Sequence, residues 1–423
     1  MSRPLRLVYV APTFATAGNF PAGANPWNAQ PMRVVPAPSY FLPGTVPPAE
    51  YMNYLFGNGF DQMDALAANF LSTFDFVSPI QALNWPNTIV RTGGVGTERI
   101  MSAFWDTFNA RWILTSGLTG GTTSKYINVS SDAGVSYSLL QTLSPTGAGN
   151  LLAGVCDPAS NNSIICPSAQ TFLYVSTTGT AWASQTAPGV VSTYTQALFF
   201  KGLFVAIGTG SANTVARLIT SPDTAIWTDR TASIPAAIAT LPMSQRWAAA
   251  ASPTILVAIP GSDASNTAYA TMHSTDGITW IAGSITNVNI VAGDLPSSIA
   301  YSPTDGKFMM TLISGLNTKI MTSVDGLTWT YLRTIVGYNF YSISVLGSAW
   351  VAASLRNSTI EEAIYSLDAG LTWSTSPLRL PVDANPPVGG STVFAVFANT
   401  TQFLLASGVA AYTSLNAGPV ATF

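Results

Sequence analysis

The feature that most constrains this chain is a short phrase that recurs along most of its length. Residues 274–280 read STDGITW, and residues 323–329 read SVDGLTW. Related phrases occur at five further positions, and successive copies start 43 to 53 residues apart. The copies begin at Ser130, Ser176, Ser221, Ser274, Ser323, Ser366 and Ser414. A repeat with a period in the forties indicates one supersecondary unit copied many times, each unit burying its apolar face against the next.

The intervals between copies divide into short strand-like segments. Residues 298–332 contain SIAYS, KFMMTLIS, KIMTS and LTWTYL, separated by turns at PTDG, GLN and VDG. Glycine, asparagine, aspartate and proline at these breaks are the usual turn residues. No interval has helical spacing over ten residues. We therefore predict an all-β fold, a seven-bladed β-propeller over residues 84–423, preceded by an extended proline-rich strap and a short helical segment.

The repeated phrase is expected at the turn between the third and fourth strands of each blade. Asp and Ser side chains accept hydrogen bonds from nearby backbone N–H groups, and Gly adopts the positive φ that such a turn needs. The Trp is expected on the fourth strand, where its ring covers the turn and the blade edge. The turn residues are Asp132, Asp223, Asp276, Asp325 and Asp368, and the aromatic residues are Tyr137, Trp182, Trp227, Trp280, Trp329 and Trp373. Asp276→Ala or Trp280→Ala should cost roughly 1–4 kcal/mol.

This phrase resembles the Asp-box (BNR) repeat of sialidases and related propellers. Two copies match in a seven-residue form, the copy at Ser366 matches in an eight-residue form, and four are degenerate. The resemblance leaves two interpretations of the aspartates. They could be calcium ligands or catalytic acids, or they could be turn staples, repeated because the blade is repeated. We favour the staple, because a catalytic residue need occur only once in a ring.

The resemblance also raises the question of glycan hydrolysis. The sialidase pattern implies three convergent arginines, a Tyr nucleophile with a Glu partner, an acidic proton donor and an Arg-Ile-Pro stretch. The nearest match here is ERIM at residues 98–101, which lacks the proline. Glu361 and Glu362 are adjacent and alternate across a strand, which suits a glycosidase pair poorly. The chain contains four Glu in total, at Glu50, Glu98, Glu361 and Glu362. We predict no catalytic residue and no release of sugar by the purified protein.

Composition gives no support to metal, cofactor, nucleic-acid or membrane binding. The one histidine, His273, has no second His or Cys nearby, so neither a metal site nor a catalytic triad is expected. Cys156 and Cys166 could face each other across a hairpin, but we expect ordinary buried thiols. A net charge of −3 without clustered Lys and Arg gives no reason to expect nucleic acid. No run of 18 apolar residues occurs, so no membrane span is expected, and the start of the chain does not read as a cleaved signal.

The first 80 residues have a different character. Ten of the 28 prolines fall within the first 50 residues, which therefore form neither a helix nor a central strand. Beyond Pro48, an apolar stripe of Met63, Leu66, Phe70 and Leu71 predicts a short helix. Residues 19–74 resemble the N-terminal part of bacteriophage tail-fibre and related virion appendage proteins. That resemblance implies a segment, residues 1–80, that attaches the chain to a particle.

The resemblance of residues 19–74 implies a virion structural protein, a tail fibre or other appendage or decoration protein. Residues 1–80 would bind other virion proteins, and the propeller would be displayed for host-surface glycan, host-surface protein or subunit binding, as a homo-oligomer in the particle. Charged residues make up 8% of the chain, which suits a protein buried in a large assembly. The alternative is a sialidase-like hydrolase or depolymerase, secreted or carried on a virion. Three arginines beside a Tyr–Glu pair at the centre of the propeller would favour that alternative. A third, weaker alternative is a cellular carbohydrate-binding propeller.

The last repeat predicts how the ring closes. Its fourth strand is poor, because Pro419 follows Gly418 and Ala421 stands in place of the Trp. Upstream, residues 88–91 form a β-branched run that has no blade of its own. We predict that residues 88–91 pair with the seventh blade, with Trp85 supplying the missing aromatic cover.

Overall fold

The computed structural model describes most of the repeat region. The described residues are 89–90, 98–118, 125–134, 136–143, 150–190, 192–210, 215–239, 243–262, 269–285, 289–291, 293–356, 360–374, 394–407 and 410–413. The chain divides into two compact units, Met1–Phe76 and Val77–Phe423, where the sequence predicted 1–80 and 84–423. The predicted strap and helix before residue 77, and Trp85, lie outside the described residues.

The strands of the second unit form seven antiparallel sheets, numbered here in chain order. Sheet 1 contains β2 (Glu98–Asp106), β3 (Arg111–Leu118), β4 (Lys125–Ser130) and β5 (Ser138–Leu143). Sheet 2 contains β6 (Leu151–Cys156), β7 (Ser163–Pro167), β8 (Phe172–Ser176) and β9 (Ala183–Thr186). Sheet 3 contains β10 (Ser192–Phe200), β11 (Leu203–Gly210), β12 (Ala216–Ser221) and β13 (Thr228–Asp229). Sheets 4 and 5 contain β14 (Met243–Ala251), β15 (Leu256–Ser262), β16 (Tyr269–Ser274) and β17 (Ile281–Ile285); and β18 (Leu295–Ser302), β19 (Lys307–Ser314), β20 (Asn317–Ser323) and β21 (Thr330–Ile335). Sheets 6 and 7 contain β22 (Tyr338–Leu346), β23 (Ala349–Arg356) and β24 (Ile360–Ser366); and β25 (Phe394–Ala398), β26 (Phe403–Ser407), β27 (Ala410–Thr413) and β1 (Ile89–Val90).

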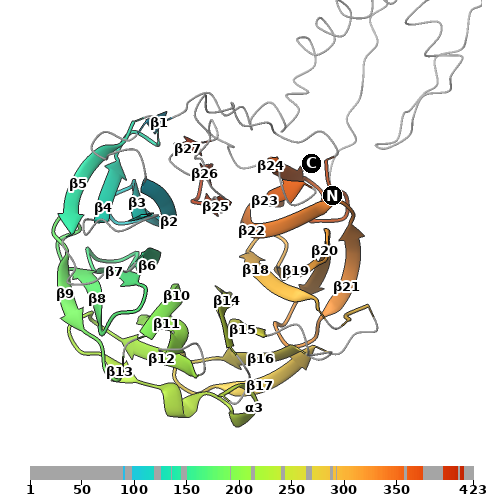
Figure 1. Ribbon diagram of the computed structural model, residues 1–423, viewed down its shortest axis with the longest axis horizontal. Coiled ribbons are helices and arrows are strands. Elements are labelled where there is room, and N and C mark those ends of the chain that lie inside the picture. Colours follow the sequence, from blue (N-terminus) through green and yellow to red (C-terminus); the bar gives the residue numbers. More distant parts are fainter. Residues whose placement is uncertain are drawn as a thin grey trace, which may run out of the picture. The chain divides into compact units, whose positions relative to one another are not determined.

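The sheets follow one another around a ring (Figure 1). The first strand of each sheet contacts the first strand of the next, from β2 through β6, β10, β14, β18 and β22 to β25, and β25 contacts β2 again. The first strands therefore surround the centre, and the fourth strands lie at the outside. This radial arrangement of four-stranded sheets is that of a β-propeller, and the prediction of an all-β propeller is confirmed.

Seven apolar clusters, one between each pair of neighbouring sheets, form the core. The cluster between sheets 3 and 4 includes Phe200, Leu256 and Met272, and the cluster between sheets 7 and 1 includes Leu404 and Trp112. The second strands are covered by sheets on both faces, which explains their continuous apolar sequences such as LFVAIGTG in β11. The fourth strands are largely exposed, as in β9. Burial between sheets, rather than within one sheet, is what holds each repeat in place.

The number of complete blades differs from the prediction. Six sheets have four strands, whereas sheet 6 has three among the described residues. Its fourth strand was expected from Leu371 onward, but the described residues there, up to Ser374, form no ladder. One backbone hydrogen bond, from Ser374 N to Tyr365 O at 2.8 Å, stands where other sheets have a pair of strands.

The predicted pairing of residues 88–91 with the seventh sheet is confirmed for the two middle residues of that segment. Strand β1 pairs antiparallel with β27, with Ile89 opposite Ala411 and Val90 opposite Ala410. Strand β1 is the outermost strand of sheet 7, so this sheet combines an upstream segment with the last three strands of the chain. Residues 88 and 91 lie outside the described part. Strands from both ends of the ring thus complete one four-stranded sheet.

Helical structure among the described residues is limited to one connection. A 3₁₀ turn at Thr231–Ser233 and the four-residue α3 (Ala236–Ala239) link sheets 3 and 4. Ile238 of α3 is buried in the cluster between those sheets. In the described part of the chain, no helix is long and apolar enough to cross a membrane.

Candidate functional site

The repeated phrase lies at one topological position in six sheets. Its serine is the last residue of the third strand each time, at Ser130, Ser176, Ser221, Ser274, Ser323 and Ser366. Each of these serines is almost fully buried. In sheet 4 the hydroxyl of Ser274 accepts a hydrogen bond from Gly277 N at 2.8 Å and donates to Asp276 Oδ1 at 2.9 Å. The copy at Ser414 lies outside the described residues.

The aspartates bind the backbone of their own turns. Asp276 Oδ1 accepts hydrogen bonds from Ile278 N and Thr279 N, both at 2.7 Å. Asp325 and Asp223 accept the equivalent pairs. In the longer form of the turn, Asp132 and Asp368 each accept from one backbone N–H and one hydroxyl of the same residue, Ser136 and Thr372 respectively. In sheet 2 Thr178 replaces the aspartate, and its hydroxyl accepts from Ala181 N at 3.1 Å. A threonine can thus perform this role, which requires no negative charge.

Acid should weaken these turns. Partial desolvation raises the pKa of Asp276 and Asp325, but hydrogen bonds from backbone N–H groups and the serine hydroxyl outweigh it and lower each pKa to about 2. The unfolded pKa is about 3.9, so the carboxylates stabilise the fold above about pH 4 and lose this contribution as the pH falls toward 2. We expect the double variant Asp276→Asn, Asp325→Asn to be less stable than the parent at pH 6. The difference should shrink toward pH 2, as measured by thermal unfolding; a difference independent of pH would contradict this account.

The aromatic residues of the repeated phrase were predicted to lie on the fourth strands, but they lie just before them. Tyr137, Trp182, Trp227, Trp280 and Trp329 directly precede the fourth strands instead of lying on them. Trp373 follows the same turn in sheet 6, where no fourth strand is described. Their rings also do more than cover a blade edge: Trp280 and Trp329 belong to the apolar clusters between neighbouring sheets. The prediction missed this because the turn lengths were not known.

Sheet 3 has a residue in the turn that its backbone disfavours. Thr224 takes the place of glycine and has a φ of 67°, which costs a β-branched residue about 1–3 kcal/mol. Its Oγ1 is buried and has no hydrogen-bond partner among the described residues. We expect Thr224→Gly to raise the free energy of unfolding by about 1 kcal/mol, because strain relief exceeds the loss of a buried methyl group and of chain stiffness. Thr279→Gly, at a position without positive φ, should lower it; the same sign for both in denaturant titrations would refute the strain argument.

The turns also bind the sheet before them, a feature that sequence reasoning missed. Lys201 of sheet 3 donates to Thr275 O at 2.8 Å, and Lys307 of sheet 5 donates to Ala369 O at 2.7 Å. Gln402 of sheet 7 donates to Ala133 O of sheet 1 at 2.8 Å, which adds a polar contact to the ring closure. In each case the donor lies near the start of a second strand. The acceptors are backbone carbonyls, so no residue type in the acceptor turn signals the contact.

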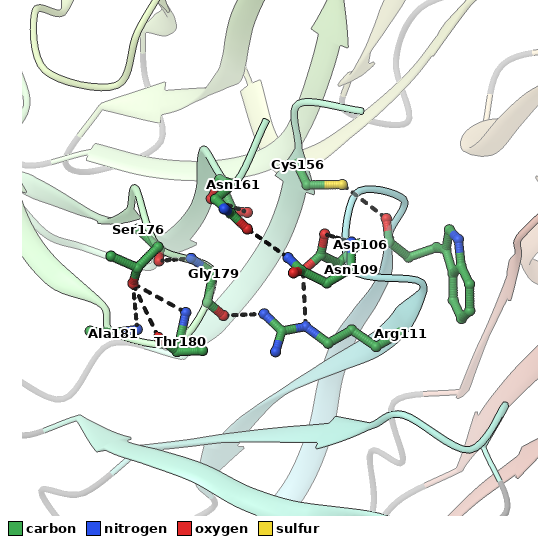
Figure 2. A network of polar contacts seen from close by, with 12 residues as sticks. Asp106, Asn109, Arg111, Cys156, Asn161, Ser176, Gly179, Thr180 and Ala181 are labelled. Carbon is green, nitrogen blue, oxygen red and sulfur yellow. Dashed lines mark hydrogen bonds and ion pairs between the residues drawn. The ribbon is translucent and has the colours of Figure 1, made fainter. Parts of the chain in front are cut away.

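A denser version of this contact joins sheets 1 and 2 (Figure 2). Arg111 binds Asp106 through Nε at 2.9 Å and donates through its guanidinium to Gly179 O in the turn of sheet 2. The Asp106 side chain is 1% exposed. Asn109 donates to Asp106 Oδ2 and to Asn161 Oδ1 of sheet 2, both at 2.8 Å. The network links sheets, and its residues are not among those that line the central cavity described below, so we assign it a structural role.

A cavity of about 1300 Å³ occupies the centre of the ring. All seven first strands contribute to its wall, including Trp247 of β14. Five of these strands contain a β-bulge whose extra residue lines the cavity. These residues are Met101, Leu152, Thr195, Ser297 and Tyr341. A bulge turns one side chain away from the strand's alternation, and bulges are frequent beside functional sites.

The cavity wall carries no charged side chain among the residues the structure describes. Its polar groups are hydroxyls, amides, indole N–H groups and the Cys156 thiol, and half-buried aromatic residues from several sheets lie among them. The polar residues are Ser102, Thr107, Thr195, Gln196, Ser297, Ser298, Ser342, Ser344, Asn399 and Thr400. Tyr341 is present, but the described residues of this wall include neither an arginine nor a glutamate. The wall therefore offers binding surface without the paired carboxylates that glycoside cleavage uses.

Several wall residues also tie neighbouring first strands together. Gln196 donates to Trp247 O at 2.7 Å. Ser298 Oγ accepts from Ile343 N at 3.1 Å, and Ser342 Oγ donates to Val396 O at 3.1 Å. Each of these three polar residues follows the bulge position of its own strand. The hydrogen bonds hold the wall in a defined geometry, which favours pre-organised binding.

The remaining candidate residues are not brought together. His273 lies on β16, and burial lowers its pKa. Cys156 and Cys166 are free, buried thiols, as predicted, and burial raises the pKa of Cys156 to about 11. Glu361 and Glu362 are consecutive residues of β24, and their side chains lie outside what is described. Within the described ranges, no group of three or more His, Cys, Asp or Glu could hold a metal ion.

Comparison with known proteins identifies the fold alone. No protein-family model and no curated protein matches the chain. Among solved structures, YCF48 bound to D1 peptide has a TM-score of 0.50 and 14% identity, over 77% of this chain and 99% of that one. The β-propeller domain of Cps50 (Swd1) from Myceliophteria thermophila has a TM-score of 0.52 and 8% identity, over 77% and 98%. An extracellular domain assigned to a hybrid two component system of B. thetaiotaomicron has a TM-score of 0.53 and 8% identity, over 77% and 39%. At these identities the chain is shown to be similar to β-propellers in fold.

Proposed function

We propose that this protein is a non-catalytic structural component of a bacteriophage particle, a tail fibre or other appendage or decoration protein. Residues 1–80 bind other virion proteins, and the propeller is displayed to bind a host-surface molecule or a neighbouring copy. The turns are Asp-box turns. Each of the seven sheets, including sheet 6 with its three described strands, is one blade of the propeller. The chain is located in the virion as a homo-oligomer, after assembly in the host cytoplasm.

The observation that carries the binding role is the uncharged central cavity. Its wall comes from all seven first strands and is fixed by hydrogen bonds between them, such as Gln196 to Trp247 O. The aspartates of the repeated turns, by contrast, are dispersed around the ring and bind their own backbone. A rigid wall without carboxylates supports binding rather than hydrolysis. The particle location rests on the sequence of residues 19–74, which resembles phage appendage proteins.

Deleting residues 1–80 tests the attachment role. The deletion spares β1, so the ring can still close, and we expect a folded and soluble propeller. That propeller should fail to join particles when it is produced in place of the full chain, as measured by its occupancy in purified particles. Deletion of residues 1–18 is the matched control, because it leaves the resembling stretch intact and should not change occupancy. Normal occupancy of the 81–423 fragment would refute attachment through this segment.

The same preparations separate binding from hydrolysis. We expect neither full-length protein nor the 81–423 fragment to release sugar from sialylated or bacterial surface glycans. Turnover that disappeared on replacement of one carboxylate would establish the hydrolase alternative instead.

A further inference from the structure

The charge pattern of the central cavity restricts what it can bind. Sixteen Lys and Arg and nineteen Asp and Glu occur in the chain, yet none is among the described residues of the wall. An ionic ligand would enter this cavity without a partner charge, and desolvating an unpaired ion is costly. The ligand that fits is therefore neutral. A volume of about 1300 Å³ is larger than the ~300–1,000 Å³ of typical small-molecule pockets and accommodates a chain of several units.

Half-buried aromatic rings supply the apolar part of the wall. Trp105, Phe199, Tyr341 and Phe397 come from β2, β10, β22 and β25, which are four different sheets. Trp105 is held by an edge contact with Trp112, and Phe199 by one with Phe204. Rings held in this way present rigid apolar surface at little conformational cost. Such surfaces match the C–H faces of sugar rings.

The wall also contains polar atoms without a partner. Thr195 Oγ1, Trp247 Nε1 and Asn399 Nδ2 are buried and form no hydrogen bond with any described residue. All three residues line the cavity. Leaving a buried polar group unsatisfied costs about 1–3 kcal/mol. These atoms are shielded from water in the structure, so a ligand rich in hydroxyl oxygens reaches one only where a side-chain rotation turns it toward the cavity, as rotation of Thr195 about χ1 would. An amide N–H₂, an indole N–H and a hydroxyl are the donors that neutral sugars accept from.

A peptide is the other class of chain that could enter. An extended peptide would bind by adding to the free edge of a first strand, which requires regular spacing of N–H and C=O groups. Bulges or register shifts interrupt six of these strands, the exception being β25 within its described residues. Bulged edges are poor templates for strand addition. The wall therefore favours sugar over peptide.

We propose that the central cavity binds a neutral oligosaccharide, with uncharged hydroxyl and amide groups of the wall, Thr195 among them, forming hydrogen bonds to it and Trp105, Phe199, Tyr341 and Phe397 packing on sugar rings. This deepens the binding role proposed above and rests on it. The sugar is a host-surface glycan in that setting, and its chemistry, uncharged and several units long, follows from the wall alone.

The test uses the full-length protein on an array of neutral and acidic oligosaccharides of three to six sugars, followed by calorimetric titration of the best neutral binder. Thr195→Val keeps the shape and removes one unpartnered hydroxyl, so we expect about 3- to 10-fold weaker binding and no loss of stability. Phe397→Leu keeps apolar volume and should weaken binding about 10-fold. Thr304→Val, at an exposed turn outside the wall, is the matched control and should leave affinity unchanged.

Selective binding of neutral sugars that falls in both wall variants would support the proposal. Preference for acidic sugars, binding of unstructured peptides alone, absence of binding to any glycan, or unchanged affinity in Thr195→Val would overturn it. These outcomes are independent of particle incorporation. If the 1–80 deletion abolishes incorporation while the wall variants bind sugar normally, attachment through residues 1–80 is supported and the sugar site is refuted. If the deletion leaves incorporation normal while the wall variants lose sugar binding, attachment is refuted and the sugar site is supported.

Discussion

Arg111→Ala should lower the free energy of unfolding by about 3–5 kcal/mol, because it leaves the buried Asp106 carboxylate without its cationic partner. Asp106 is 1% exposed and Arg111 is 11% exposed, with Nε and Oδ2 2.9 Å apart. The same guanidinium donates to Gly179 O, so the substitution also removes a link between sheets 1 and 2. Guanidinium denaturation of the full-length protein, followed by tryptophan fluorescence, measures the change.

Arg217→Ala is the matched control for this prediction. Arg217 Nη1 lies 3.8 Å from Asp229 Oδ2, and the two side chains are 19% and 38% exposed. A pair of this kind contributes about 0–1 kcal/mol. The double variant Asp106→Leu, Arg111→Met should recover much of the loss, since it removes both buried charges and fills their space. If Arg111→Ala lowered the free energy of unfolding no more than Arg217→Ala does, the buried pair would not couple sheets 1 and 2.

The fold could be predicted from sequence because its signals are local. The turn phrase specifies hydrogen bonds within five residues, as between Ser274, Asp276 and Gly277, so each copy marks one strand end independently. Its period then predicted the ring. The pairing of β1 with β27 followed from comparing the poor last strand with an unassigned β-branched run. The absence of a fourth strand among the described residues of sheet 6 was not predictable, because LTWSTS at residues 371–376 resembles the fourth strands of the other repeats.

The cavity wall could not be predicted for a physical reason. Its bulge positions hold Met, Leu, Thr, Ser and Tyr, so no residue type marks them. A bulge depends on the register between two strands, which is a property of the pair and not of either sequence. The contacts from one sheet to the next turn are equally hidden. Lys201 and Thr275 are 74 residues apart, and the acceptor is a backbone carbonyl.

The second large effect on the free energy of unfolding is expected from a buried tryptophan. In sheet 4, replacing Trp280 should cost more stability than replacing Asp276 of the same turn. Trp280 is 6% exposed and packs with Phe200, Leu256 and Met272 between sheets 3 and 4. We expect Trp280→Ala to lower the free energy of unfolding by about 3–5 kcal/mol, since it opens a cavity where two sheets meet.

Asp276→Ala should cost less, about 1–2 kcal/mol, because its carboxylate is exposed and water can replace it at the turn N–H groups. The Trp280→Phe variant keeps an aromatic ring but removes the indole N–H, so it distinguishes the packing of the ring from the contribution of the N–H group. Trp280 Nε1 has no partner among the described residues, so phenylalanine loses some packing but no hydrogen bond and should cost at most about 1.5 kcal/mol. Denaturant midpoints of the three variants should therefore rank Trp280→Ala well below the other two. If Asp276→Ala were the most damaging, the turn hydrogen bonds rather than the contact between sheets would be the dominant contribution of the repeat.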